Sequence, residues 1–352
     1  MKKQYLERIE NTRKILDTKK LDAILLFSGE SLNDLSSENT YYLSGFFDVW
    51  SHAVLVTKKD AVCFTADILR AEKECALDVA NARTEKIHAF LNKRRMRRIG
   101  IDSGFSYNQW SKLRGKLKRP VFCDISKDML EIRGIKGKEE LSKMRLAASI
   151  TKKTLDVVQK KMRCSEEGAL VRKVKQEFAL NNAEPAFAPI VAGDGNSANI
   201  HYFECDQKYN KILMADIGAR KDFYNSDFTR THVLCKDKEM LRAHDTVARL
   251  VDGLLDFVAV GKTSLDVHNY AKEFLVKAGY KKENFSNFHA LGHGVGLNVH
   301  EGPHITERAP SANTILRENM VFALEPALYL KNKFGIRIES TFVLTKRGLK
   351  KL

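Results

Sequence analysis

The sequence predicts two domains of different fold class: an α/β domain over residues 1–130, with helices on a mixed sheet, and an α+β domain over residues 131–352. Three observations support this prediction. The chain has 352 residues, 43% of them hydrophobic, which is enough for two separate cores. The first third alternates strand-like and helical runs. The remainder places pairs of helices before β-hairpins.

The amino-terminal domain begins with an amphipathic helix, in which Tyr5, Ile9, Ile15 and Leu16 supply the apolar face. Strand-like runs follow, with one helical stretch near residues 68–79 and another between the last two strands. In chain order the strand runs are DAILLF, HAVLVT, AVCFTA, RRIGIDS and VFCDI. This alternation predicts a mixed sheet with helices packed on it.

The second domain begins where the pattern changes, between residues 124 and 138, without a low-complexity linker. Two helices, 138–161 and 166–180, are predicted before a first hairpin. Two more, 238–258 and 264–277, are predicted before a histidine-containing segment and a second hairpin. Two such units can enclose one site between them.

Five polar side chains of the second domain lie in apolar or glycine-flanked segments, where an unpaired charge would be costly. They are Asp216 in LMAD, Asp227 in YNSDFTRT, His293 in LGHGVG, Glu325 after VFAL and Glu339 after GIRI. Four carboxylates and one imidazole are too acidic a set for a single tetrahedral zinc ion. They suit two divalent ions, such as manganese, cobalt, iron or zinc, that are bridged by carboxylates.

The spacing of the four acids supports the same interpretation. Asp216 and Asp227 lie in two β-type runs around a turn-like stretch, and Glu325 and Glu339 lie in two more, joined by a polar turn at residues 331–333. A hairpin can place two carboxylates on the same side of neighbouring strands. Each acid alone can instead pair with a nearby base, but all five residues in this order favour a metal centre.

The order Asp, Asp, His, Glu, Glu, in the contexts DIGA, SDFTRT, GHGVGLNVHEGP, LEP and GIRIES, resembles the pita-bread metallopeptidases. That family includes methionine aminopeptidase, aminopeptidase P, prolidase and the metal-free creatinase. The resemblance covers essentially the whole chain. It implies a creatinase-like domain over residues 1–130 and a pita-bread catalytic domain over residues 131–352.

The resemblance also assigns the ligands. Asp216 would be a terminal ligand of one ion, Asp227 and Glu339 would bridge, and His293 with Glu325 would complete the second ion. Creatinase and the family's non-catalytic binding proteins lack an intact set of these ligands, whereas this chain has every position.

Further roles follow from the same resemblance. Glu325 would carry a proton from water towards the leaving nitrogen, and His201 and His300 would hydrogen-bond the scissile carbonyl or the developing oxyanion. His201 and His300 are also expected to bind substrate, together with His289, His304 and Arg337. Arg337 should project to the same side of its strand as Glu339, where it can hold either a carboxylate or a substrate group. Plausible supporting hydrogen-bond donors are Thr229, Thr231 and Tyr224.

The activity implied by the resemblance is that of a metallo-exopeptidase. It would hydrolyse Xaa-Pro bonds, in dipeptides or at peptide amino termini, by attack of a hydroxide shared between two divalent ions. The amino-terminal domain favours the aminopeptidase P and prolidase branch over methionine aminopeptidase. Prolidases often carry an arginine after the HExP motif, but this chain has His304 in HEGPHI, so the choice between dipeptidase and aminopeptidase stays open.

Two other functions are compatible with the fold. One is a non-catalytic pita-bread protein that binds a partner through a basic surface, which the intact ligand set disfavours. The other is a metal hydrolase of the same fold that acts on a small non-peptide substrate, which the ligands alone do not exclude.

The formal net charge is +16, but the lysines and arginines are spread along the chain, with only short clusters such as residues 93–98 and 346–351. No aromatic-interleaved RNA motif accompanies them, which favours a solvated basic face over specific nucleic-acid binding. The first residues lack the apolar run of a signal peptide, and no stretch has the length of a membrane span. We therefore expect a cytoplasmic protein and, from the family resemblance, a homodimer.

Overall fold

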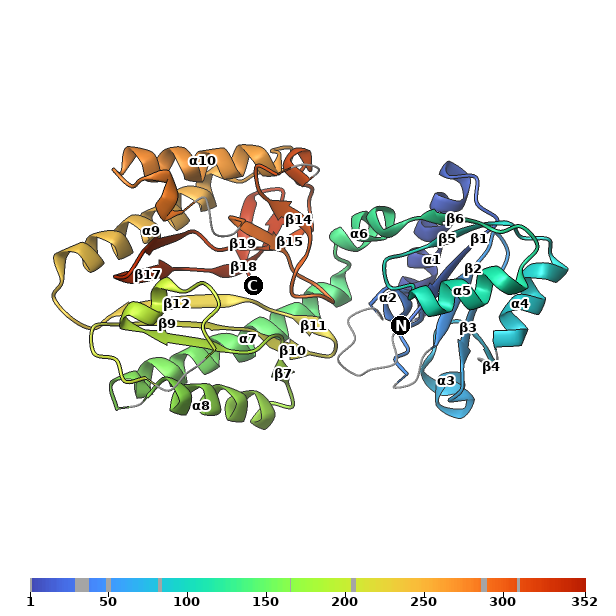
Figure 1. Cartoon of the computed structure of the whole chain (residues 1–352), viewed down its shortest axis with the longest axis horizontal. Coiled ribbons are helices and arrows are strands. Elements are labelled where there is room, and N and C mark those ends of the chain that lie inside the picture. Colours follow the sequence, from blue (N-terminus) through green and yellow to red (C-terminus); the bar gives the residue numbers. More distant parts are fainter. Residues whose placement is uncertain are drawn as a thin grey trace. The chain divides into compact units, whose positions relative to one another are not determined.

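The computed structural model describes residues 2–28, 38–48, 52–81, 84–164, 166–203, 207–285, 290–308 and 311–352. The chain divides into two compact units, Met1–Arg133 and Gly134–Leu352, and each has its own hydrophobic core (Figure 1). No helix among the described residues is both long and apolar enough to cross a membrane.

The first unit is built around a six-stranded mixed sheet with the strand order β4-β3-β2-β1-β5-β6. Strands β1, β5 and β6 run parallel, as do β3 and β4, whereas β2 is antiparallel to both of its neighbours. The strands are β1 (Ala23–Phe27), β2 (Ala53–Val56), β3 (Ala61–Thr65), β4 (Asp78–Asn81), β5 (Arg98–Ile101) and β6 (Val121–Asp124).

Helices pack against this sheet because alternate side chains of each central strand point to opposite faces. Ala23 and Leu25 of β1 belong to one cluster with Ile87 and Leu113 from two of the helices. Residue Ile24, on the opposite face, is also fully buried. The helices are α1 (Lys2–Thr18), α2 (Glu38–Ser44), α3 (Ile68–Glu74), α4 (Thr84–Lys93), α5 (Tyr107–Lys116) and α6 (Ser126–Gly134).

The second unit places its strands between two pairs of helices (Figure 1). The helices are α7 (Lys138–Lys161), α8 (Glu167–Leu180), α9 (Lys238–Phe257) and α10 (Ser264–Lys277). The strands are β7 (Glu184–Pro185), β8 (Ile190–Gly193), β9 (Ile212–Ile217), β10 (Ala219–Lys221), β11 (Tyr224–Asn225), β12 (Phe228–Val233), β13 (Gly292–Gly294), β14 (Glu301–Ile305), β15 (Val321–Leu324), β16 (Ala327–Leu330), β17 (Phe334–Arg337), β18 (Ser340–Thr345) and β19 (Gly348–Lys351).

Local sequence explains where the helices of this unit begin. The Asp237 side chain accepts hydrogen bonds from the first backbone N–H groups of α9, and Thr263 with Asp266 forms a capping box at the start of α10. One face of α9, including Val247 and Leu250, is fully buried in the core beneath the strands. The apolar stripe of the helix thus fixes its position against the sheet.

Two sheets carry the site, with the orders β12-β9-β8 and β14-β13-β15-β18-β19. Each contains a hairpin that bends and continues as a separate ribbon. The pair β9 and β12 continues into β10 and β11, and the pair β15 and β18 continues into β16 and β17. The four acids singled out from the sequence lie at or next to these bends.

Candidate metal centre

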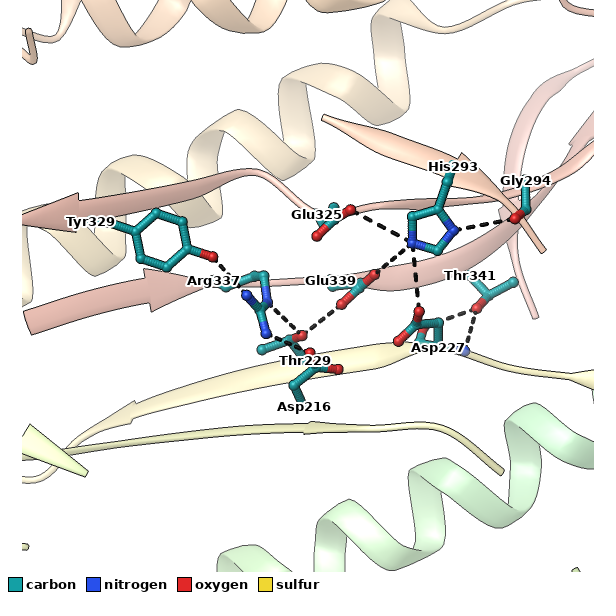
Figure 2. A network of polar contacts seen from close by, with 10 residues as sticks. All are labelled: Asp216, Asp227, Thr229, His293, Gly294, Glu325, Tyr329, Arg337, Glu339 and Thr341. Atoms are coloured by element: carbon teal, nitrogen blue, oxygen red, sulfur yellow. Dashed lines mark hydrogen bonds and ion pairs between the residues drawn. The ribbon is translucent and has the colours of Figure 1, made fainter. Parts of the chain in front are cut away.

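The four acids lie where the two hairpins bend. Asp216 is the penultimate residue of β9 and pairs with Thr229, while Asp227 immediately precedes β12. Glu325 follows β15, and Glu339 immediately precedes β18. A bend interrupts the regular alternation of side chains, so acids from both strands of a hairpin can face one centre. Figure 2 shows the four carboxylates approaching from the two hairpins.

His293 occupies the centre of β13, between Gly292 and Gly294, and pairs with β14 on one side and β15 on the other. Both glycines are required by close packing of the backbone. A Cβ atom at Gly292 would lie 2.1 Å from the carbonyl oxygen of Ala323, and one at Gly294 would lie 2.1 Å from that of Gly302. The GHG sequence therefore lets three strands pack tightly around the imidazole.

The imidazole of His293 faces three carboxylates. Its Nε2 atom lies 3.6 Å from Asp227 Oδ2, 3.6 Å from Glu325 Oε1 and 4.0 Å from Glu339 Oε1 (Figure 2). Asp216 joins the same cluster, because one oxygen each from Asp216, Asp227 and Glu339 lies within 4.8 Å of the others.

These contacts would be ion pairs only if the imidazole were protonated, and burial opposes that. Burial, together with the neighbouring His300, lowers the pKa of His293 to about 3. The carbonyl oxygen of Gly294 lies 3.2 Å from Nδ1 and can only accept, so Nδ1 carries the proton. The lone pair of Nε2 therefore points at carboxylate oxygens, and a cation between them would remove the resulting repulsion.

The buried carboxylates are likewise disfavoured in their charged form. Burial, followed by the charges of the neighbouring acids, raises the pKa of Asp227 and of Glu339 well above their ordinary values. Burial also raises the pKa of Glu325 to about 8, with Arg337 opposing this shift and Asp216 adding to it. Because ionisation of these acids is costly without a counter-charge, a bound cation would stabilise the ionised cluster.

In two of the acids, a neighbouring side chain donates a hydrogen bond to one carboxylate oxygen, and the other oxygen has no partner among the described residues. Arg337 Nη2 donates to Asp216 Oδ2, and Thr229 Oγ1 donates to Glu339 Oε2 at 2.6 Å. Among the described residues, the buried atoms Asp216 Oδ1, Asp227 Oδ1 and Glu339 Oε1 have no hydrogen-bond partner. Buried oxygens without partners that face one centre, together with a neutral imidazole, fit divalent cations that take oxygen and nitrogen ligands.

Arg337 is almost fully buried, and its guanidinium connects several of these groups (Figure 2). Besides Asp216, it donates to Thr229 Oγ1 at 3.1 Å and to Tyr329 OH at 2.6 Å. The nearby acids Asp216 and Glu339, together with Tyr329, raise its pKa against the effect of burial, so the guanidinium stays charged.

A cavity of about 440 Å³ opens onto the centre. His201, His300, His304 and Arg337 line it together with the four acids and the imidazole of the cluster. The rings of His300 and His293 lie edge to face, with centroids 4.1 Å apart, and the ring of His201 stacks on Phe203 with centroids 6.4 Å apart. His289 lies outside the described residues.

Part of the cavity wall was not predicted from the sequence. Phe187, Ile190, Ile200 and Phe203 give it an apolar side. The alternating pattern of FAPI, followed by the loop residues around IHYF, contains these residues but does not show that they meet. Tyr329 was also missed, although its position four residues after Glu325 in a buried strand is visible in LEPALYL.

The three residues expected to donate supporting hydrogen bonds, Thr229, Thr231 and Tyr224, have different partners. Thr229 contacts Glu339 directly, and Thr231 Oγ1 donates to the backbone oxygen of Arg337 at 2.8 Å. The hydroxyl of Tyr224 instead donates to Glu140 at 3.0 Å, so it supports neither Glu339 nor Arg337.

Comparison with known proteins matches both units to family models. Residues 142–346 match the metallopeptidase family M24, and residues 8–135 match the creatinase/prolidase N-terminal domain. The chain is 28% identical to the Xaa-Pro dipeptidase of Pyrococcus horikoshii over 355 residues, which cover 98% of this chain and 96% of that protein. It is 35% identical to an uncharacterized peptidase of Methanocaldococcus jannaschii over 233 residues, which cover 65% of this chain and 66% of that protein.

Solved structures give the same result. The prolidase from Pyrococcus horikoshii OT3 superposes with a TM-score of 0.88 at 27% identity, covering 98% of this chain and 97% of that one. The X-Pro aminopeptidase from Thermotoga maritima superposes with a TM-score of 0.85 at 26% identity, covering 97% of both chains. The fold is therefore a creatinase-type amino-terminal domain followed by a pita-bread domain, as expected. The model of metallopeptidase family M24 matches residues 142–346, more than half of the chain, and this chain therefore belongs to that family.

Proposed function

We propose that this protein is a metal-dependent exopeptidase that hydrolyses Xaa-Pro bonds in dipeptides or at the amino termini of short peptides. The observation that carries the proposal is the group of buried carboxylate oxygens without partners, facing the lone pair of His293 at the base of a cavity with an apolar side. The names of the full-length relatives, Xaa-Pro dipeptidase and X-Pro aminopeptidase, support the substrate class.

We assign the ligands of two divalent ions as follows. Asp216 would hold one ion, His293 and Glu325 would hold the other, and Asp227 and Glu339 would be shared between both. Manganese, cobalt, zinc and iron all accept this set of donors. Divalent ions held there would acidify a water molecule and polarise the carbonyl of the scissile bond.

The chain's own residues supply the proton transfers and the binding of charge. Glu325 lies beside His293 and lines the cavity; when a bound cation keeps it ionised, its carboxylate can accept a proton from water and deliver it to the leaving nitrogen. His300 and His201 line the cavity and can donate to the oxygen that becomes negative as the carbonyl is attacked. Arg337 is committed to Asp216, Thr229 and Tyr329, so we assign it to orient a ligand and not to bind substrate.

The shape and polarity of the cavity support a proline substrate. Its apolar side, Phe187, Ile190, Ile200 and Phe203, can take the pyrrolidine ring, which has no N–H group to satisfy once its peptide bond is formed. His304, at the rim, is a weaker partner for a substrate carboxylate than an arginine would be. We therefore expect tripeptides and dipeptides to be cleaved with less discrimination than a strict dipeptidase shows.

The alternatives are less well supported. A non-catalytic binding protein would not need a full set of ligands, and a small non-peptide substrate leaves the apolar side of the cavity without a role. We also infer a homodimer and a cytoplasmic location for an enzyme of this family, and light scattering of the purified protein would measure the oligomeric state.

The test is an assay of metal-depleted protein supplied with manganese or cobalt. Xaa-Pro dipeptides and Xaa-Pro-Yaa tripeptides should be cleaved, whereas matched Xaa-Ala peptides should be cleaved far more slowly. Asp227→Asn is the control, since loss of a bridging carboxylate should lower both bound metal and activity. Equal rates with and without proline would refute the substrate class, and activity that survives metal depletion would refute the mechanism.

A further inference from the structure

Three turns of the first unit meet at one edge of its sheet. They are residues 18–22 between α1 and β1, residues 93–98 between α4 and β5, and residues 116–120 between α5 and β6. Because β1, β5 and β6 are parallel neighbours, their starting ends lie side by side. Backbone hydrogen bonds join the turns, from Asp22 N to Arg98 O at 2.8 Å and from Val121 N to Arg97 O at 2.8 Å.

Ten of the sixteen residues in these turns are basic, and we call the three turns the basic edge. Their cations are Lys19, Lys20, Lys93, Arg94, Arg95, Arg97, Arg98, Lys116, Lys118 and Arg119. The one acid in the three turns is Asp22, which accepts hydrogen bonds from the backbone N–H groups of Arg97 and Arg98. All of these cations are exposed except Lys19, which is half-buried.

Local electrostatics does not cancel this charge. Lys19 pairs with Asp128 at 3.1 Å, and Arg94 pairs with Asp60 at 3.7 Å. The carboxyl ends of α1, α4 and α5 also point here, and each helix end counts for about half a negative charge. Discounting Asp22, the two paired acids and the three helix ends leaves roughly five positive charges without compensation on the described part of this unit.

The backbone conformation shows that the charge is not a by-product of the turns. Lys20, Arg95 and Arg119 have φ angles of 54°, 55° and 53°. After a helix, this left-handed conformation favours glycine or asparagine, and a long side chain there is less favourable. Each of the three turns nevertheless has a lysine or arginine at that position.

We propose that the basic edge binds the phosphate backbone of duplex nucleic acid without reading its sequence. Three neighbouring strands span roughly 10 Å, and long side chains widen this reach. A duplex presents one charge per about 1.7 Å of its axis, so several phosphates fall within that width. Half of the cations here are guanidinium groups, which can bind phosphate in a bidentate manner.

The composition of the turns favours duplex nucleic acid over a single strand and over a membrane surface. They contain no aromatic residue on which an unpaired base could stack, so single-stranded binding would lack its usual platform. A membrane surface is typically bound by cations together with exposed apolar groups. Here the one large exposed hydrophobic residue beside the described turns is Val121.

The experiment measures binding of the full-length protein to a fluorescent DNA duplex by anisotropy, between about 50 and about 200 mM salt. The variant combines Lys20→Asn, Arg95→Asn and Arg119→Asn. Asparagine suits the left-handed conformation, so the fold should be kept while three charges are lost. We expect affinity at low salt to fall roughly tenfold or more, and the slope of log K against log salt to drop by roughly 2.5.

Two controls make the result decisive. The variant Lys153→Glu, Lys175→Glu and Lys238→Glu alters exposed lysines of the second unit and should bind the duplex nearly as well as the native protein. Peptide hydrolysis by the asparagine variant should be unchanged, which separates this proposal from the active site. Salt-independent binding, or equal binding by the asparagine variant, would overturn the proposal. Binding to phosphatidylserine vesicles without binding to the duplex would assign the edge to membranes instead.

Discussion

At the scale of single residues, the centre is defined by oxygen atoms that differ in their partners. Thr229 holds Glu339 Oε2 and Arg337 holds Asp216 Oδ2, while the other oxygen of each acid has no partner in the described chain. Fixing one oxygen orients the other, and that reduces the entropy lost when a cation binds. The order of the five proposed ligands was visible in the sequence, but which carboxylate oxygen the protein holds was not.

His300 provides the sharpest test of roles at this scale. It lies close enough to Asp227 and His293 to be a ligand, yet we assign it to the substrate oxyanion. His300→Ala should therefore retain most of its bound metal while kcat/KM falls roughly 100-fold, as for loss of an oxyanion donor. Metal analysis and kinetics of the same sample measure both quantities.

The comparison variant is His293→Ala, which should lose metal. His300→Gln keeps a donor and should recover part of the activity. If His300→Ala loses as much metal as His293→Ala, His300 is a ligand and its assignment is wrong.

His304 tests substrate length. Burial lowers its pKa below the ordinary value of 6.5, so the imidazole is mostly neutral at pH 7 and attracts a carboxylate weakly. His304→Arg should raise kcat/KM for dipeptides relative to carboxy-terminally amidated ones, by on the order of 1 kcal/mol for a partly solvated pair. His304→Gln, which has no charge, should not. A native enzyme that already rejects amidated substrates would show that another residue binds the carboxylate.

At the scale of elements, the tight packing of β13 determines where the histidine lies. Gly294→Ala would put a methyl group 2.1 Å from the carbonyl oxygen of Gly302, so β14 would have to move. We expect a loss of stability of roughly 2–3 kcal/mol and a larger loss of metal affinity, because His293 is adjacent. Calorimetry and metal titration measure the two effects.

The matched control lies on the partner strand. A Cβ atom at Gly302 would meet nothing within 4 Å, so Gly302→Ala should be tolerated. If both variants behave alike, close packing at Gly294 is not what positions the histidine.

The bounds of the helices also show which structural features are determined by the neighbouring sequence alone. Helices α7 and α10 have the bounds that the sequence predicts, because their periodicity lies within the helix and their capping residues lie within or next to it. Helix α3 ends at Glu74, short of the expected residue 79, because residues 78–81 pair with β3 as strand β4. Helix α4 was not predicted, although Ile87 and Leu91 have the helical spacing that would have indicated it.

At the scale of the whole molecule, the cluster links folding stability to pH and metal. The folded protein without metal retains protons on Asp227, Glu339 and Glu325 that the unfolded chain releases near its ordinary values of 3.8 and 4.5. Where the folded state holds more protons, stability falls as pH rises. His293 acts in the opposite direction, but only below its ordinary value of 6.5.

We therefore predict that protein treated with a chelator loses stability between pH 6.5 and about 8. The loss should be on the order of 1 kcal/mol for each pH unit and each carboxylate that titrates. Added manganese or cobalt should remove the loss, since a cation stabilises the ionised acids. Unfolding by urea at a series of pH values, with and without metal, measures this. A flat profile for the metal-depleted protein would contradict the raised pKa values.

Short-range periodicity and residue chemistry encode the fold class, the long helices and the five acidic and histidine residues proposed as ligands, so these could be predicted from the sequence. Tertiary structure alone decided which groups meet across long separations: Arg337 with Asp216, Phe187 with Phe203 in the cavity, and the three turns of the basic edge. These contacts depend on which strands pair and in which register. Pairing minimises the free energy of the whole chain, so no single segment specifies it.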